Sequence, residues 1–217
     1  MLPVLRLEEI CKSYSCKNGT QNVLNQMNLQ VFEKEVFAIT GKSGSGKSTL
    51  LNIMAATLAA DSGAMYYRGK NMQEASKKER ASYRREIISY IPQGLYLLED
   101  RDVFNNIALP LQYVKMEKSE IRENVQKISA ELSISHLLHK SINTLSGGEK
   151  QRVAICRALV KKPEILFADE PTGSLDLVNE KVVLEMFTRL KEQGATIIVA
   201  THDATVLDIC DKEISLN

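Results

Sequence analysis

The sequence predicts an α/β fold in which a parallel sheet is interrupted by a helical insertion. Three short apolar runs, at 36–40, 165–168 and 195–201, are typical of parallel strands that are covered on both faces. The middle of the chain, about 93–162, is helical in character. We therefore expect one domain, 1–217, with a core lobe formed by about 1–92 and 163–217 and a helical subdomain formed by about 93–162.

The first half of the chain supplies strands and a helix of the core lobe. Met27, Leu29 and Val31 alternate with polar residues, which is the period of a half-exposed strand. The buried run that follows ends in glycine-rich sequence and is expected to enter a loop. A helix is then expected at 49–58 and a further strand at 87–91.

The second half alternates helices with the two remaining buried strands. Apolar residues recur at helix spacing over 121–132, with Ser119 as the expected N-cap. A second helix is expected at 149–160. A third carries its apolar positions over 182–190, and Gly194 is placed to close it.

Composition limits the possible partners. The chain has 217 residues, of which 44% are hydrophobic, enough for a globular core. Its 28 basic residues nearly balance its 27 acidic ones and leave a net charge of +1, so we expect no nucleic-acid partner, since phosphate contacts need a basic surplus. No apolar run approaches the ~20 residues that span a bilayer. Charged residues interrupt the N-terminus, which argues against a signal peptide. We expect a cytosolic chain that reaches the membrane only through a partner.

The cysteines and histidines predict neither a disulfide nor a metal centre. The four cysteines form no CxxC pair, and their mostly apolar neighbours favour reduced thiols in the core of a cytosolic protein. His136 and His139 have the spacing of one helix face. Because no other ligand cluster lies nearby in the sequence, we expect a surface pair.

A glycine-rich loop follows the buried strand at 36–40. It satisfies the P-loop pattern GxxxxGK[ST] in full, with the residues Gly41-Lys42-Ser43-Gly44-Ser45-Gly46-Lys47-Ser48. Its glycines let backbone N–H groups surround phosphates, and the helix that follows adds the positive end of its dipole. Lys47 should reach the β- and γ-phosphates, and the Ser48 hydroxyl should ligate Mg²⁺. The motif leaves kinases, GTPases and ATPases open, although the sequence has no NKxD-type guanine-reading motif.

Two carboxylates end the apolar strand at 165–168. Asp169 can hold the Mg²⁺ shell as a Walker-B aspartate does. Because side chains alternate along a strand, Glu170 should point elsewhere and polarise a water that faces the γ-phosphate. Strands often end in acidic residues, but after a complete P-loop this pair predicts nucleotide hydrolysis.

A second short motif selects one class of ATPase. The segment Leu145-Ser146-Gly147-Gly148-Glu149-Lys150-Gln151 resembles LSGGQ, the signature motif of ABC ATPases, with Glu149 in the final place. A serine and two glycines at the start of a helix form an anion site. The chain has one P-loop, so a second γ-phosphate site implies a second subunit.

This resemblance covers almost the whole chain and implies roles for further residues. Gln93 matches the Q-loop glutamine, which senses Mg²⁺ and the attacking water and lies beside the transmembrane contact. Asp176, in Pro171-Thr172-Gly173-Ser174-Leu175-Asp176, matches the D-loop aspartate that crosses toward the other subunit. His202 matches the H-loop histidine that contacts the γ-phosphate. Tyr14 matches the aromatic residue that stacks on adenine.

Together these inferences give a complete predicted site. The expected catalytic residues are Lys47, Gln93, Glu170 and His202. The expected Mg²⁺ ligands are Ser48, Gln93 and Asp169. The expected ATP-binding residues are Tyr14, Gly41, Ser43, Gly44, Ser45, Gly46, Lys47, Ser48, Thr49, Ser146, Gly147, Gly148 and Asp176.

The family resemblance also implies the fold, the cofactors and the partners. It implies a P-loop NTPase core with a parallel sheet, an antiparallel β portion and an inserted α-helical subdomain. ATP and Mg²⁺ are the expected cofactors. The expected partners are a second copy of the chain, which joins it when ATP binds, and a transmembrane permease subunit. The chain is expected to be cytoplasmic and peripheral on the inner face of the cell membrane.

Three segments resemble the branch that contains the macrolide-exporter, lipoprotein-release and cell-division ATPases. They are Arg84-Arg85, the stretch 106–111 and the stretch 172–176. The chain departs from that branch at Pro92, where an aromatic residue is usual, at 99–102 and at Asn105. The departures lie in the segment that is expected to face the membrane partner, and they affect the prediction of partner and cargo rather than that of hydrolysis.

Two other functions share parts of this pattern. An importer ATPase for amino acids or similar solutes has the same catalytic motifs. An SMC-like DNA-repair ATPase also carries a signature motif, but it needs long coiled coils, which the short stretch 94–144 does not supply. We therefore favour an exporter or mechanical-transmission ATPase, with the importer as the alternative.

Overall fold

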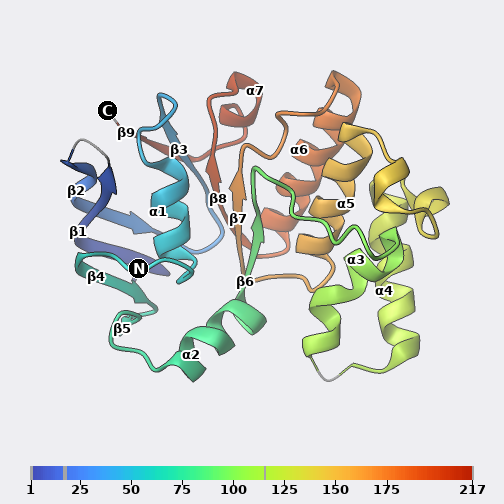
Figure 1. Ribbon diagram of the computed structural model, residues 1–217, viewed down its shortest axis with the longest axis horizontal. Coiled ribbons are helices and arrows are strands. Elements are labelled where there is room, and N and C mark those ends of the chain that lie inside the picture. The colour runs from blue at the N-terminus through green and yellow to red at the C-terminus, as the bar shows by residue number, and fades with distance from the viewer. Residues whose placement is uncertain (1, 17–18, 115, 217) are drawn as a thin grey trace.

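The computed structural model describes residues 2–16, 19–114 and 116–216 and shows two sheets beside a group of helices (Figure 1). The strands are β1 (Leu5–Cys16), β2 (Gly19–Val31), β3 (Val36–Gly41), β4 (Ser62–Tyr67), β5 (Lys70–Asn71), β6 (Ile88–Ile91), β7 (Ile165–Asp169), β8 (Thr196–Ala200) and β9 (Lys212–Leu216). The α-helices are α1 (Lys47–Met54), α2 (Lys77–Ser82), α3 (Val103–Ala108), α4 (Lys118–Glu131), α5 (Gly147–Leu159), α6 (Leu177–Glu192) and α7 (Ala204–Leu207). A π-helical turn (Tyr83–Ile87) and three short 3₁₀ segments (Leu109–Tyr113, Ser135–Leu137, Ile142–Thr144) complete the described elements.

The larger sheet is parallel and has the strand order β6-β7-β8-β3-β9. Its central strands are apolar at successive positions because both of their faces are buried. Phe37 and Ile39 pack with α1 and the smaller sheet, whereas Val36 and Ala38 pack with α6 and the helical segment. The predicted α/β fold with a parallel sheet is confirmed.

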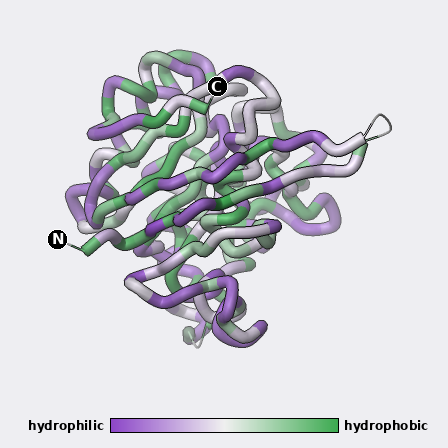
Figure 2. Tube along the Cα trace, turned by 90° about the vertical axis from the view of Figure 1, so that its left-hand side faces the viewer, coloured by the Kyte–Doolittle hydropathy of each residue, from purple (hydrophilic) through white to green (hydrophobic). Residues whose placement is uncertain are grey.

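The smaller sheet is antiparallel, with the order β2-β1-β4-β5, and α1 lies between the two sheets. Figure 2 shows its strands from the outside, with hydrophilic and hydrophobic stretches alternating along them. Leu5, Leu7 and Ile10 are buried against α1, and intervening side chains face outward. This sheet is the antiparallel portion that the family resemblance implied.

Between β6 and β7 the described residues form helices joined by loops, with one isolated bridge and no other strand pairing. Its helices α3, α4 and α5 share one hydrophobic core with the parallel sheet and α6. Within this segment Asn106 is fully buried, and its amide donates to the carbonyls of Leu98, Arg101 and Asp102. That side chain fixes the irregular stretch that precedes α3. The division into two lobes remains our interpretation.

Several predicted boundaries were wrong by a few residues. The helix expected at 49–58 spans Lys47–Met54, because left-handed Gly46 lets the loop enter the helix early and Ala56, with φ 52°, ends it. Ser119 is not the N-cap of α4. Glu117 takes that position, and its N–H donates to Glu120 Oε2 at 3.1 Å, so Ser119 lies inside the first turn.

The cysteines also differ from expectation, although all four are free. Only Cys156 is buried; Cys16 is exposed, and Cys11 and Cys210 are partly exposed. The sequence context of a thiol therefore did not determine its burial. Among the described residues no helix is long and apolar enough to cross a membrane.

Candidate nucleotide site

The P-loop, Gln93, the carboxylate pair and His202 line one open cavity of about 740 Å³. They meet because β6, β7, β8 and β3 are adjacent parallel strands, whose carboxyl ends lie at the same edge of the sheet. Gln93 follows β6, Asp169 ends β7, His202 follows β8 and the P-loop follows β3. The lining consists of Gln21, Val23, Gly41, Lys42, Ser43, Gly44, Gly46, Lys47, Ser48, Thr49, Gln93, Asp169, Glu170, Gly173 and His202.

Backbone geometry at Gly46 explains the loop shape. Gly46 has φ 100°, which side chains disfavour, and a Cβ there would lie 2.8 Å from Val23 Cγ1. Both the backbone conformation and the lack of space therefore require glycine at this position. The Lys47 ammonium donates to the carbonyls of Gly41 at 2.8 Å and Lys42 at 3.1 Å, which holds its charge inside the loop. The start of α1 adds unpaired N–H groups and a positive dipole end. The loop is therefore built to surround an anion.

Asp169 and Ser48 form the oxygen pair expected beside the phosphates. Asp169 is 5% exposed, and burial raises the pKa of its carboxyl, while a hydrogen bond with Ser48 works in the opposite direction. A carboxylate, a hydroxyl and the amide of Gln93 on one cavity wall fit the oxygen ligands that Mg²⁺ prefers. Among the described residues there is no cluster of three His, Cys, Asp or Glu that could hold a metal. Mg²⁺ commonly completes its shell with waters and substrate phosphates rather than with protein ligands alone.

Glu170 points into the cavity because its backbone is left-handed. Its φ is 47°, and its N–H donates to the carbonyl of Ala200 at 2.9 Å. This conformation, rather than strand alternation as predicted, sets its direction, because β7 ends one residue earlier. Its Oε1 lies 2.8 Å from Nδ1 of His202, and its Oε2 accepts from the Thr201 hydroxyl at 3.4 Å. Non-glycine residues rarely adopt such a conformation, and functional sites are where they cluster.

Tyr14 lies beside this cavity on β1. Tyr14 is 41% exposed, and its hydroxyl lies 3.3 Å from Thr49 Oγ1 at the start of α1. The Lys12 ammonium lies 5.8 Å from the ring centroid. An exposed ring at the edge of a phosphate site is suitable for stacking on a base. Ser45 does not line the cavity; its Oγ is buried without a partner among the described residues.

The signature residues lie outside the cavity. Ser146 caps α5, and its N–H and hydroxyl both donate to Glu149 Oε2, at 2.7 and 2.8 Å. These bonds lower the pKa of Glu149. Gly147 and Gly148 open the same helix. Glu149, in the place of the usual glutamine, therefore completes a capping box at the predicted anion site.

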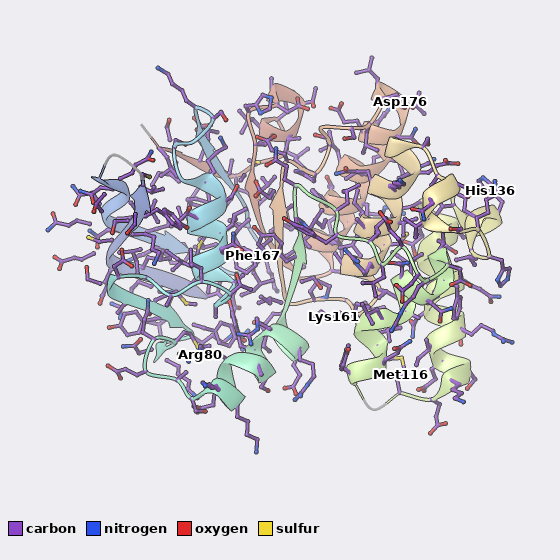
Figure 3. All side chains as sticks on the ribbon, in the orientation of Figure 1. Arg80, Met116, His136, Lys161, Phe167 and Asp176 are labelled. Atoms are coloured by element: carbon purple, nitrogen blue, oxygen red, sulfur yellow. The ribbon has the colours of Figure 1, made fainter. Side chains whose placement is uncertain are left out.

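Asp176 also lies outside the cavity and caps α6. It accepts from the N–H and the side-chain amide of Asn179, both at 2.9 Å. In Figure 3 it stands at the edge of the molecule, on the side that carries α5 rather than α1. Of the predicted site residues, Ser146, Gly147, Gly148 and Asp176 are thus not brought to the chain's own P-loop.

Sequence reasoning missed some residues of the cavity wall. Gln21 and Val23 lie on β2, and only the pairing of β2 with β1 brings them to the P-loop. No local pattern could have found them. Lys42 and Gly173 lie within segments already quoted for other residues, so the motifs themselves contained that signal. The departures at Asp102 and Asn105 have a local explanation, since Asp102 caps α3 and accepts from the Asn105 N–H and amide.

The fold and this site define a P-loop nucleotide hydrolase. The family model for "ABC transporter" matches residues 24–173, and the chain belongs to that family. It is the ATP-binding, ATP-hydrolysing subunit that the sequence predicted.

Named relatives agree with the predicted branch. The chain is 36% identical to a protein named macrolide export ATP-binding/permease protein MacB from Pasteurella multocida, over 99% of the chain and 33% of that protein, so it spans about a third of that relative. It is 37% identical to the lipoprotein-releasing system ATP-binding protein LolD of Shewanella denitrificans, over 98% of the chain and 92% of that protein. Neither these names nor the family match supports the amino-acid importer or the DNA-repair alternative.

A solved structure has the same fold. It is described as the dimeric structure of MJ0796, a bacterial ABC transporter cassette, and is 31% identical with a TM-score of 0.93, covering 98% of this chain and 94% of that one. A second, of equal identity and TM-score, is described as a post-hydrolysis state of the same cassette bound to ADP and Pi. The predicted fold class is therefore confirmed at the level of the whole chain.

Proposed function

We propose that this chain drives export through a separate membrane permease and hydrolyses ATP as one half of a dimer. The proposal of a dimer rests on the position of Ser146 in the structure. It caps α5 outside the cavity that Lys47 and Glu170 line, so one chain holds a phosphate cradle and a separate anion site. A second copy would bring that anion site over the first copy's ATP. The dimeric description of the MJ0796 cassette supports this assembly.

In this proposal each group of site residues binds a different part of the nucleotide or its metal ion. The P-loop residues and Thr49 hold the phosphates, and Tyr14 stacks on adenine. Ser48, Asp169 and Gln93 hold Mg²⁺, which when bound neutralises phosphate charge. Ser146, Gly147, Gly148 and Asp176 act toward the partner's nucleotide.

The hydrolytic step falls to Glu170, which polarises the attacking water. Its Oε1 contact to Nδ1 of His202 orients the ring, so that Nε2 is available to the γ-phosphate. Thr201 contacts the other carboxylate oxygen. Glu170 is thus held by two neighbours while the ring that it orients contacts the phosphate.

The permease and the membrane location rest on the relatives. One relative's name joins an ATP-binding part to a permease, and another belongs to a lipoprotein-releasing system. A third is named bacitracin export ATP-binding protein. We therefore place this chain on the inner face of a membrane, bound to a permease, with export as its direction. The three names differ in cargo, and our proposal specifies none.

Liposome flotation tests the location. Purified chain should float with vesicles only when its permease is present in them, because attachment is through that partner. Empty vesicles of the same lipids are the control. Strong flotation with empty vesicles would show direct lipid binding and contradict the proposal.

A further inference from the structure

A partly buried cation joins the signature helix to the segment after Gln93. Arg157 lies in the last turn of α5, and its guanidinium donates to the carbonyl of Tyr96 at 2.8 Å and to that of Leu95 at 2.5 Å. Burial lowers the pKa of Arg157. Among the described residues it forms no ion pair. A partly buried guanidinium is therefore satisfied by two backbone oxygens of another segment.

Those two carbonyls belong to an unfavourable backbone. Leu95 and Tyr96 both have φ 43°, the left-handed region that side chains disfavour. The Leu95 N–H donates to the Pro92 carbonyl at 3.3 Å and closes the turn that contains Gln93. A planar fork that binds successive carbonyls fixes the orientation of both peptide planes. Arg157 thus holds the chain two residues after Gln93.

We propose that Arg157 is a positioning residue for ATP hydrolysis, which fixes the Leu95–Tyr96 backbone and thereby places the Gln93 side chain in the cavity. The proposal rests on the role that the proposed function gives to Gln93. The signature helix α5 then sets the position of a residue in the chain's own site. At its other end α5 is held to the segment after Glu170, where buried Gln151 donates to the Pro171 carbonyl at 2.6 Å.

A favourable charge at a helix end does not account for this arrangement. A cation near the carboxyl end of α5 is favoured by the dipole wherever its side chain points. Lys161 lies one turn later, at the lower end of α5 in Figure 3, and donates to the carbonyls of Arg84 at 3.1 Å and Arg85 at 2.9 Å. Two cations near the carboxyl end of α5, Arg157 within the helix and Lys161 just beyond it, thus bind two different segments, one after β6 and one before it. Lys161 is therefore a matched control for Arg157.

A double-mutant cycle tests the proposal. Arg157→Gln should lower kcat by about 10²-fold, a loss that misplacing a catalytic group by about 1 Å can cause, with KM for ATP unchanged. Gln93→Ala should lower kcat to a similar extent. Because both act on one side chain, the double variant should be no slower than Gln93→Ala alone. Lys161→Gln should retain the wild-type kcat.

Hydrogen exchange gives a readout that does not depend on activity. Arg157→Gln should speed amide exchange in 94–98 and leave 84–88 unchanged, and Lys161→Gln should do the reverse. If Arg157→Gln does not fold, Arg157→Lys replaces it, because it keeps the charge but lacks the planar fork. The same expectations then apply.

The outcomes separate this proposal from the proposed function. If Gln93→Ala lowers kcat and a folded Arg157 variant does not, positioning by Arg157 is wrong and the role of Gln93 stands. If Gln93→Ala leaves kcat unchanged, the role of Gln93 is wrong and the positioning proposal fails with it. Losses that multiply in the double variant, or an equal loss in Lys161→Gln, also overturn the proposal.

Discussion

Oε1 of Glu170 lies 2.8 Å from Nδ1 of His202. The two residues follow neighbouring strands, β7 and β8, and the left-handed backbone of Glu170 turns its side chain toward the ring. The Glu170 side chain is 15% exposed and that of His202 is 80% exposed, so the carboxylate is sheltered while the imidazole ring is open to solvent. In the proposed function Glu170 polarises a water and His202 contacts the γ-phosphate.

The first prediction concerns this carboxylate. Glu170→Gln should lower ATP turnover by about 10²–10⁴-fold, the usual contribution of a general base, because the amide cannot accept a proton. Nucleotide binding should persist, since the P-loop is unchanged. A steady-state ATPase assay beside a fluorescent-nucleotide titration measures both. Glu185→Gln, on the exposed face of α6, is the control, and near-normal turnover of Glu170→Gln would refute the assignment.

The second prediction concerns the P-loop cation. Lys47→Ala should abolish hydrolysis in a folded protein, because we propose that the ammonium held by the Gly41 and Lys42 carbonyls reaches the phosphates. Circular dichroism and an ATPase assay check fold and activity together. Lys78→Ala, on the exposed side of α2, should behave as wild type. An unchanged spectrum with persisting activity in Lys47→Ala would contradict the role.

The third prediction concerns the composite site. In the Glu170→Gln background a dimer should accumulate when ATP is added. A nucleotide that bridges two subunit surfaces couples nucleotide binding to subunit association. Adding Ser146→Arg should prevent the dimer by placing a bulky cation in the interface, while the chain's own nucleotide binding is retained. Light scattering after size exclusion measures the dimer. Ser119→Arg, exposed on α4, is the matched control.

Two results would count against that assignment. One is a Ser146→Arg protein that dimerises as readily as its parent. The other is a loss of monomer nucleotide affinity as severe as that of Lys47→Ala, which would mean that the signature acts within its own chain. Ser146 also caps α5, and loss of a cap costs about 1 kcal/mol. A thermal melt of the variant therefore accompanies the assay.

The fourth prediction concerns acid stability. Hydrogen bonds from Lys12 and then Ser13 lower the pKa of Asp61 from 3.8 to about 2. A depressed carboxyl pKa stabilises the fold above the unfolded value, and this stabilisation is lost as pH falls through the folded value. The Tm difference between wild type and Asp61→Asn should thus be constant at neutral pH and shrink as pH falls from 3.8 toward about 2. Asp208→Asn, whose carboxylate makes no described ion pair, is the control. A difference that does not vary with pH would show that the Lys12–Asp61 pair contributes no pH-dependent stability.

The sequence by itself determined the class of protein. The P-loop, the Asp169–Glu170 pair and the signature each need particular residue types at fixed spacing, because each shapes the backbone locally. Glycine at 46 is required by a positive φ, and a serine before two glycines caps a helix. Such features depend on neighbours along the chain, so they can be read from it. The buried strands could be predicted for the same reason, as runs of apolar residues.

Only the tertiary structure decided how those parts meet. Gln93 and His202 reach the P-loop because the strand order is β6-β7-β8-β3, and that order depends on burial between segments far apart in the chain. The direction of Glu170 follows from a left-handed backbone that its neighbours in sequence do not require. The hydrogen bonds from the Arg157 guanidinium to the Leu95 and Tyr96 carbonyls join residues that no sequence motif connects. Long-range packing sets these contacts, since a local pattern carries no information about which strand or helix lies beside it.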